Sequence, residues 1–180
     1  MDGPKDLIVP AAKGLLLCLE GTLDRYDAGV CRSFLAPGGP PAWDTCCRCD
    51  ATHEGQAWVQ IQQIGPTENF PTIQTGPMRC HPPEHAVQLN VAILRCASTV
   101  DDGGDPPAAS TLTGEFEKVQ RDRAIIDEAM TCCYLPSADP GTYTIGVWTP
   151  LGPSGGCVGG QRTLTLAVKR CGCPPPDEES

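Results

Sequence analysis

The sequence predicts an α+β fold in which an antiparallel sheet of about four strands carries two helices on one face. Four short segments alternate apolar and polar residues, which is typical of half-buried strands. Two longer segments repeat apolar residues at spacings of three and four, which is typical of amphipathic helices. These elements follow one another as helix, strand, strand, helix, strand, strand. This order favours an antiparallel sheet with both helices packed on one face.

The length and composition of the chain predict a single domain. Its 180 residues are enough to bury one core, whereas two independent domains of half that size would each be marginal. There are 20 glycines and 19 prolines, and aromatic residues make up only 5%. We therefore expect one domain over residues 1–180 with long Gly/Pro-rich loops and a flexible C-terminal tail at 174–180.

The first half of the chain is expected to hold one helix and one strand. The helix begins at Pro10, which suits a first helical position, and ends near Asp27 to Gly29. Residues 28–55 show no sustained period and are predicted to form a loop. Residues 57–64 alternate and are predicted to form a strand. The apolar face of the helix comprises Ala12, Leu16, Leu19, Leu23 and Tyr26.

The second half is expected to hold a strand, a helix and a hairpin. Residues 86–96 give the clearest strand, and the helix spans Leu112 to Tyr134. Residues 142–148 and 162–168 alternate and should pair around a glycine-rich loop at 149–161. The stripe of the helix comprises Leu112, Phe116, Val119, Ile126, Met130 and Cys133.

The charge and hydropathy patterns argue against nucleic-acid binding and membrane insertion. The net charge is −9, whereas neutralising nucleic-acid phosphates needs clustered lysine and arginine. The acidic groups concentrate at 101–105 and at the C-terminus, and we interpret both runs as solvated. The start of the chain lacks the basic region of a signal peptide, and no stretch approaches the ~20 apolar residues of a membrane span. We expect a soluble protein made in the cytosol.

The glycine-rich stretch WTPLGPSGGCVGGQRTLTLAV (148–168) does not fit a phosphate-binding loop. Such a loop needs GxGxxG, or GxxxxGK[ST], opening onto a helix. Here no two glycines stand two apart, and the stretch leads into a predicted strand. Glycines at these positions allow positive φ angles and a close approach of another backbone. A hairpin loop of this length usually has a function or a partner.

The twelve cysteines leave several interpretations open. Cys46, Cys49, Cys80 and His85 could form a tetrahedral zinc site that links two loops. Alternatively, disulfides could staple irregular segments, although spacing cannot give their pairing. Cysteines in loops or near the C-terminus are Cys46, Cys47, Cys49, Cys80, Cys157, Cys171 and Cys173. Cys18 and Cys133 fall on or beside apolar helix faces, where we expect buried, small apolar side chains.

The sequence shows no catalytic signature, and we expect neither an enzyme nor a bound cofactor. The motifs GxSxG and HExxH are absent. All three histidines lie in predicted loops. A Cys80–His81 pair lacks an evident orienting carboxylate, and adjacent residues rarely aim their side chains at each other.

Three stretches carry a resemblance to a known class of proteins. They are HAVQLNVAILRCAS (85–98), RDRAIIDEAMTCC (121–133) and TIGVWTPLGPSGGCVGGQRTLTLAV (144–168). In them the chain resembles tail terminators and related head-to-tail connector proteins of long-tailed bacteriophages, particularly those of actinobacteria. The resemblance implies a sixfold ring in the virion, assembled in the host cytoplasm. The ring would cap the tail tube and join it to the neck.

The resemblance also implies partners and an interface. The partners would be other copies of the chain, the tail tube protein and the neck or head-completion proteins, with DNA passing through the lumen without specific binding. Acidic residues such as Asp101, Asp102 and Asp105 would repel that DNA if they lined the channel. The interface would comprise Pro150, Leu151, Gly152, Pro153, Gly155, Gly156, Cys157, Gly159 and Gly160. The alternatives are a head-to-tail stopper or adaptor ring and, in another class, a zinc-stabilised protein-interaction module.

Overall fold

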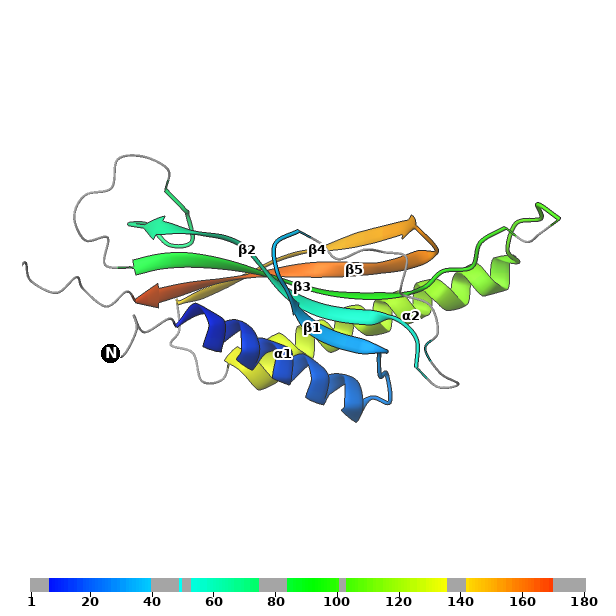
Figure 1. Cartoon of the computed structure of the whole chain (residues 1–180), viewed down its shortest axis with the longest axis horizontal. Coiled ribbons are helices and arrows are strands. Elements are labelled where there is room, and N and C mark those ends of the chain that lie inside the picture. The colour runs from blue at the N-terminus through cyan, green and yellow to red at the C-terminus, as the bar shows by residue number, and fades with distance from the viewer. Residues whose placement is uncertain are drawn as a thin grey trace, which may run out of the picture.

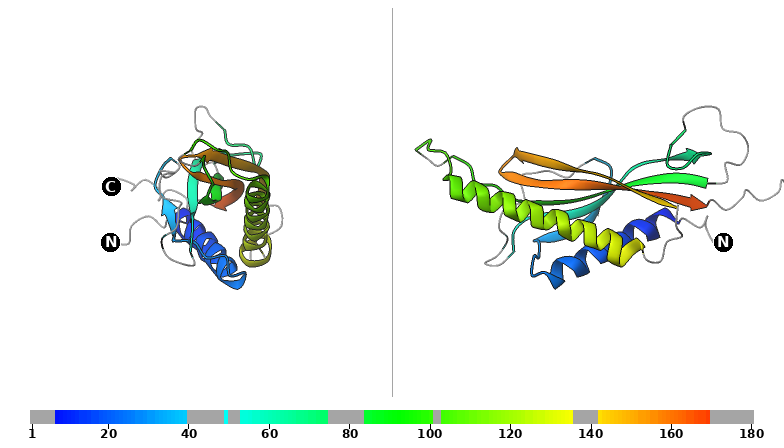
Figure 2. Two further views of the ribbon diagram at one scale, coloured as in Figure 1. Left: turned by 90° about the vertical axis from the view of Figure 1, so that its right-hand side faces the viewer. Right: turned by 180° about the vertical axis from the view of Figure 1, so that it is seen from behind.

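The computed structural model describes residues 7–39, 49, 53–74, 84–100, 103–135 and 142–169. Two helices lie on one side of a five-stranded sheet with the order β1-β2-β3-β5-β4 (Figures 1 and 2). The α+β class and the two helices are confirmed. The sheet is mixed rather than antiparallel throughout, because β1 runs parallel to β2. It also has one strand more than the four predicted.

The helices lie close to their predicted bounds. Helix α1 spans Ile8–Arg25, and α2 spans Ala109–Glu128 before a π-helical segment, η2, continues it over Ala129–Tyr134. After α1 the chain turns at Asp27, whose φ of 49° lies in the left-handed region. The buried side of α1 comprises Ala12, Leu15, Leu19, Thr22 and Leu23. Of the predicted face, Ala12, Leu19 and Leu23 are buried, whereas Leu16 is half-buried and Tyr26 is exposed.

Four of the five strands follow the predicted segments, although all four are longer. They are β2 (Gln56–Thr67), β3 (Glu84–Cys96), β4 (Tyr143–Ser154) and β5 (Cys157–Lys169). Strand β1 (Arg32–Ala36) falls inside the segment that the sequence predicted as a loop. Its five residues are too few to establish an alternating pattern, and they form a strand because β2 pairs with them in parallel from Arg32 to Ala36.

The predicted thirteen-residue loop at 149–161 is wrong. Strand β4 (Tyr143–Ser154) pairs with β5 across this stretch, and only Gly155 and Gly156 connect them. Both glycines have positive φ angles, as a two-residue hairpin turn requires. Pro150 and Pro153 lie in β4, an edge strand, where a residue without an N–H is tolerated. The prolines and glycines that suggested a loop therefore lie within a ribbon of two strands.

The sheet is buried on both faces near its centre. The main core lies between the sheet and the helices, where Leu15, Leu19, Ile126 and Met130 pack against β2, β3 and β5. A smaller cluster lies on the opposite face, built on Trp58 and joined by Ala36, Ala92, Leu94 and Cys157. Strand β3 is buried without a break from Leu89 to Arg95 because both clusters cover it. In the described segments, neither helix is long and apolar enough to cross a lipid bilayer.

Gly160 and Gly21 provide a matched test of this packing. A Cβ atom on Gly160 would lie 2.0 Å from Cζ2 of Trp148, whereas a Cβ on Gly21 in α1 would meet nothing within 4 Å. Gly160→Ala should therefore lower the free energy of unfolding by about 1–3 kcal/mol through overpacking. Gly21→Ala should raise it by about 0.5–1 kcal/mol because alanine favours helix. Urea unfolding of both variants checks this, and shifts of the same sign would contradict it.

Candidate interaction surface

The β4–β5 hairpin contains the whole interface that the sequence analysis assigned, and only its outer part is accessible. Pro150, Gly152, Pro153 and Gly155 are exposed, and Leu151 and Gly156 are half-buried. The remaining predicted residues, Cys157, Gly159 and Gly160, are buried within the sheet. A neighbouring chain cannot reach these three residues. The accessible surface is therefore residues 150–156, which we call the hairpin tip.

The hairpin tip has its shape fixed by backbone contacts. Gly152 has a φ of 81°, and a Cβ atom there would lie 2.5 Å from the carbonyl oxygen of Cys157. The amide of Ala97 donates a hydrogen bond of 2.8 Å to the carbonyl oxygen of Gly156. The tip is thus joined to the segment that follows β3. It presents an ordered ribbon to its surroundings, whereas a flexible loop would lose entropy when a partner ordered it.

Helix α2 begins at the same end of the molecule as the hairpin tip (Figure 1) and carries exposed apolar residues. In its first turns, Leu112 is 49% exposed and Phe116 is 63% exposed, although the sequence placed both on the buried stripe. Val100, which precedes the helix, is 62% exposed. The 3–4 spacing was correct, but Val119 is the first residue of the stripe that the fold buries. Leu112 and Phe116 are therefore candidate contact residues that the sequence analysis interpreted as core.

A buried arginine joins several segments at the end of the molecule that carries the hairpin tip. We call Arg95 and its partner Asp122 the clamp. Arg95 at the end of β3 donates from Nε and Nη2 to the two carboxylate oxygens of Asp122 in α2, at 2.8 and 2.7 Å. Its other donors reach the carbonyl oxygens of Ala28, Gly29 and Glu54 at 2.8–3.0 Å. All five N–H groups of the guanidinium are thus satisfied. One side chain connects β3, α2, the turn after α1 and the segment before β2.

Sequence reasoning missed this clamp, although two signals point to it. Arg95 continues the alternation of Val91 and Ile93, so it falls on the helix-facing side of β3. Asp122 lies between Val119 and Ile126 at helical spacing, so it falls on the buried stripe of α2. Opposite charges on two faces that must pack together favour a buried ion pair, because an unpaired charge there would be costly.

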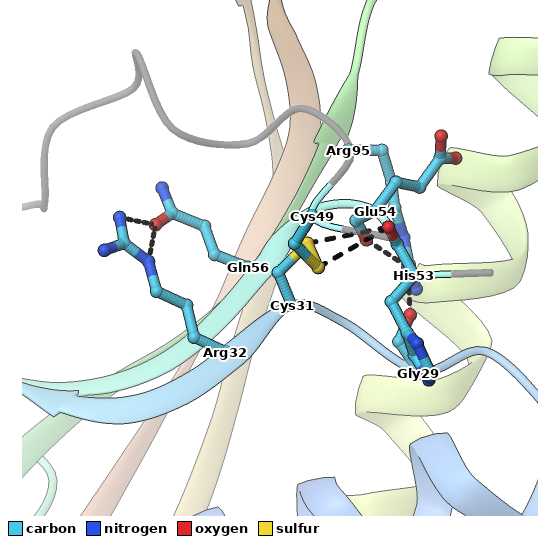
Figure 3. The surroundings of a disulfide bond; sticks show 8 residues. All are labelled: Gly29, Cys31, Arg32, Cys49, His53, Glu54, Gln56 and Arg95. Carbon is cyan, nitrogen blue, oxygen red and sulfur yellow. Dashed lines mark hydrogen bonds between the residues drawn. A yellow bond between two sulfur atoms is a disulfide. The ribbon is translucent and has the colours of Figure 1, made fainter. Parts of the chain in front are cut away.

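A disulfide between Cys31 and Cys49 lies beside the clamp (Figure 3). The amide of Cys31 donates to the carbonyl oxygen of Gly55 at 3.0 Å, and the amide of Cys49 donates to that of His53 at 3.3 Å. These bonds fix the segment that leads into β2. Gly55 has a φ of 93°, and a Cβ there would lie 2.1 Å from the carbonyl oxygen of Leu94.

This disulfide corrects the zinc hypothesis. Cys49 is bonded to Cys31, so it offers no thiolate for a metal. His85 lies in β3 opposite Val168, while Cys46 and Cys80 lie outside the described residues. In the described ranges no group of three or more His, Cys, Asp or Glu side chains could hold a metal ion.

A second disulfide corrects the prediction for Cys18 and Cys133. These residues are bonded across a Cα separation of 5.6 Å, within the usual range for a disulfide. They were expected as buried, unbonded side chains, yet Cys133 is exposed and Cys18 half-buried. The bond joins α1 to η2. The adjacent Cys132 is exposed and keeps a free thiol.

A polar cavity of about 270 Å³ lies over the clamp. Lys118 at its rim donates to Glu54 at 2.8 Å, and Arg121 donates to the carbonyl oxygen of Tyr26. A hydrogen bond to Glu128 raises the pKa of the neighbouring Tyr26 hydroxyl. The cavity is lined by Asp27, Ala28, Gly29, His53, Glu54, Arg95, Lys118, Arg121 and Asp122. Three cationic and three anionic side chains thus balance within it, and the arrangement favours neither an anion nor a cation.

The described part of the acidic run, residues 103–105, belongs to the segment before α2, at the same end as the hairpin turn (Figure 1). Asp105 is exposed, whereas Asp101 and Asp102 lie outside the described residues. The suggestion that these carboxylates line a channel for DNA stays a prediction.

Comparison with known proteins finds similarity among solved structures alone. No protein-family model matches the chain, and no curated protein matches it. Among solved structures, the chain is similar to the sheath/tube terminator of an extracellular contractile injection system, PVC, determined by cryo-EM in the extended state. The TM-score is 0.34 at 11% sequence identity. The similar region covers 98% of this chain and 63% of the terminator chain. This chain therefore spans less than two thirds of the length of the terminator chain.

Proposed function

We propose that this protein is a structural subunit of a ring at the head-proximal end of a phage tail, where it terminates the tail tube and joins it to the neck. One observation carries the proposal. The three stretches that resemble tail terminators are far apart in the sequence, yet they form one continuous body. Residues 85–98 contain most of β3, 144–168 form the β4–β5 hairpin, and 121–133 form the part of α2 and η2 that packs behind them.

The exposed surfaces of the molecule favour assembly with other chains. The hairpin tip and the exposed first turns of α2 lie at one end of an elongated molecule (Figures 1 and 2). Arg95 and the Cys31–Cys49 bond stiffen the base from which both extend. A surface that is already ordered loses little conformational entropy when it binds. Contacts between unlike patches close into a ring when the rotation per subunit fits.

The proposed role is assembly without substrate turnover. The partners would be further copies of the chain, the tail tube protein and the neck proteins, within a virion assembled in the host cytoplasm. A net charge of −9 suits a ring through which DNA passes without adhering, because like charges repel.

The purified protein is expected to form rings with a central channel, and the resemblance to tail terminators implies six subunits in each ring. Negative-stain electron microscopy and light scattering across a concentration series measure this. Particles that remain monomeric at every concentration up to the solubility limit would contradict the proposal, as would open filaments without closure.

A stopper or adaptor ring is the neighbouring possibility within the same class. Antibody labelling of the chain in intact particles separates these roles. A terminator labels the junction at the end of the tail tube, whereas an adaptor or stopper labels the neck closer to the capsid.

A further inference from the structure

We propose that the first turns of α2 pack against the exposed face of α1 in a second copy of the chain. This inference rests on the proposed ring and deepens it by assigning one contact between subunits. The surfaces concerned are the α2 overhang, defined as Leu112, Phe116 and Glu117, and the α1 stripe, defined as Val9, Lys13 and Leu17.

The α2 overhang extends a core-forming stripe beyond its own core. Leu112 and Phe116 precede the buried Val119 by seven and three residues, so all three lie on one side of the helix. Val119 is only 7% exposed, whereas Leu112 and Phe116 are largely open to solvent. Figure 1 shows the start of α2 reaching the end of the molecule, away from α1. This apolar surface is therefore of the kind that packs in a helical core, and none of the described helices and strands of its own chain covers it.

The α1 stripe is a second apolar surface that none of the described helices and strands covers. Val9, Lys13 and Leu17 are spaced by four residues and form one ridge along the helix. Val9 is 39% exposed, Leu17 is 68% exposed, and Lys13 is exposed between them. The buried residues of α1, such as Leu15 and Leu19, face the core on the other side. The ridge matches the spacing of Leu112 and Phe116, and ridges of this kind interdigitate when helices cross.

The charges of the two surfaces are complementary. Lys13 lies at the centre of the α1 stripe, and Glu117, which follows Phe116 and is turned about 100° from it around the helix, borders the apolar side of the α2 overhang. Within the described residues neither side chain takes part in an ion pair, whereas Lys118 on α2 is paired with Glu54. Contact between the surfaces would bring Lys13 and Glu117 together at the edge of an apolar patch. Opposite charges there favour the correct partner and register.

The position of the two surfaces requires a second copy. Figure 1 and the reverse view in Figure 2 place the start of α1 and the start of α2 toward opposite ends of the long axis. One molecule cannot bring its own two surfaces together without unfolding the core between them. A second copy brings the missing surface, and the resulting head-to-tail contact can repeat around an axis.

Charge reversal tests this contact. At low ionic strength, Lys13→Glu and Glu117→Lys should each raise the concentration at which half of the chains are assembled by about fivefold. The double variant, which restores opposite charges, should return it close to the wild-type value. Phe116→Ser should raise it by about tenfold or more, because it removes the largest exposed apolar side chain of the overhang. Sedimentation velocity over a concentration series measures all four.

Two matched controls lie elsewhere on the surface. Ile64→Ser removes an exposed apolar residue of β2, and Glu68→Lys reverses an exposed charge. Both should leave assembly unchanged. If the wild-type protein forms rings and every variant assembles equally well, this contact is overturned while the proposed ring stands. A wild-type protein that stays monomeric overturns both, whereas open assemblies that respond to the reversals support the contact and contradict the ring.

Discussion

Arg95→Leu is expected to lower the free energy of unfolding by about 3–5 kcal/mol, the range for removing one partner of a buried ion pair. The variant leaves the carboxylate of Asp122, whose side chain is 2% exposed, without a counter-charge. It also removes the donors that satisfy the carbonyl oxygens of Ala28, Gly29 and Glu54. Buried polar groups left unsatisfied add to the loss. Urea unfolding followed by circular dichroism measures the change.

Arg123 offers the matched control for this variant. It pairs with Asp127 one turn along α2 at 3.0 Å, and its side chain is 41% exposed. Arg123→Leu should therefore cost no more than about 1 kcal/mol, as is usual for exposed pairs. Asp122→Leu added to Arg95→Leu should recover part of the loss, because no buried carboxylate remains. Equal losses for Arg95→Leu and Arg123→Leu would contradict the role of Arg95 as a clamp.

The sequence predicted the elements whose pattern is complete within one segment. The alternation in β3 and the 3–4 spacing in α1 need no knowledge of the rest of the chain, and both were confirmed. Strand β1 depends on pairing with β2, a contact between separate segments, so its five residues carried no signal. In β4 the prolines and glycines lowered the local strand preference, yet pairing with β5 outweighs it.

The candidate surface was predictable only in part for the same reason. The glycine-rich segment was found, but a linear pattern could not show that Gly160 lies under Trp148 within a sheet. The stripe of α2 was found as well, but its period does not reveal where the sheet beneath it stops. Phe116 therefore appeared to be core although it faces solvent. The Cys18–Cys133 and Cys31–Cys49 disulfides join residues that only the fold brings together.

Breaking the Cys18–Cys133 bond is expected to have the other large effect on stability. The bond joins residues 115 apart in the sequence and so restricts nearly two thirds of the unfolded chain. The double variant Cys18→Ser, Cys133→Ser should lose about 2–4 kcal/mol of unfolding free energy, mainly because the unfolded state gains conformational entropy. In the native state, α1 and η2 still pack through Leu15, Leu19 and Met130, so the fold should persist. Urea unfolding without reductant measures the loss.

Two further variants separate the loop-closure effect from the loss of a cysteine side chain. Cys132→Ser replaces the exposed, unbonded neighbour and should change stability by less than about 0.5 kcal/mol. Cys31→Ser with Cys49→Ser opens a bond between residues only 18 apart. Since closure entropy grows with the logarithm of loop length, this pair should lose about 1.5 kcal/mol less than the Cys18–Cys133 pair. A larger loss from the shorter loop would show that native contacts around Cys31, rather than restriction of the unfolded chain, decide what each bond contributes.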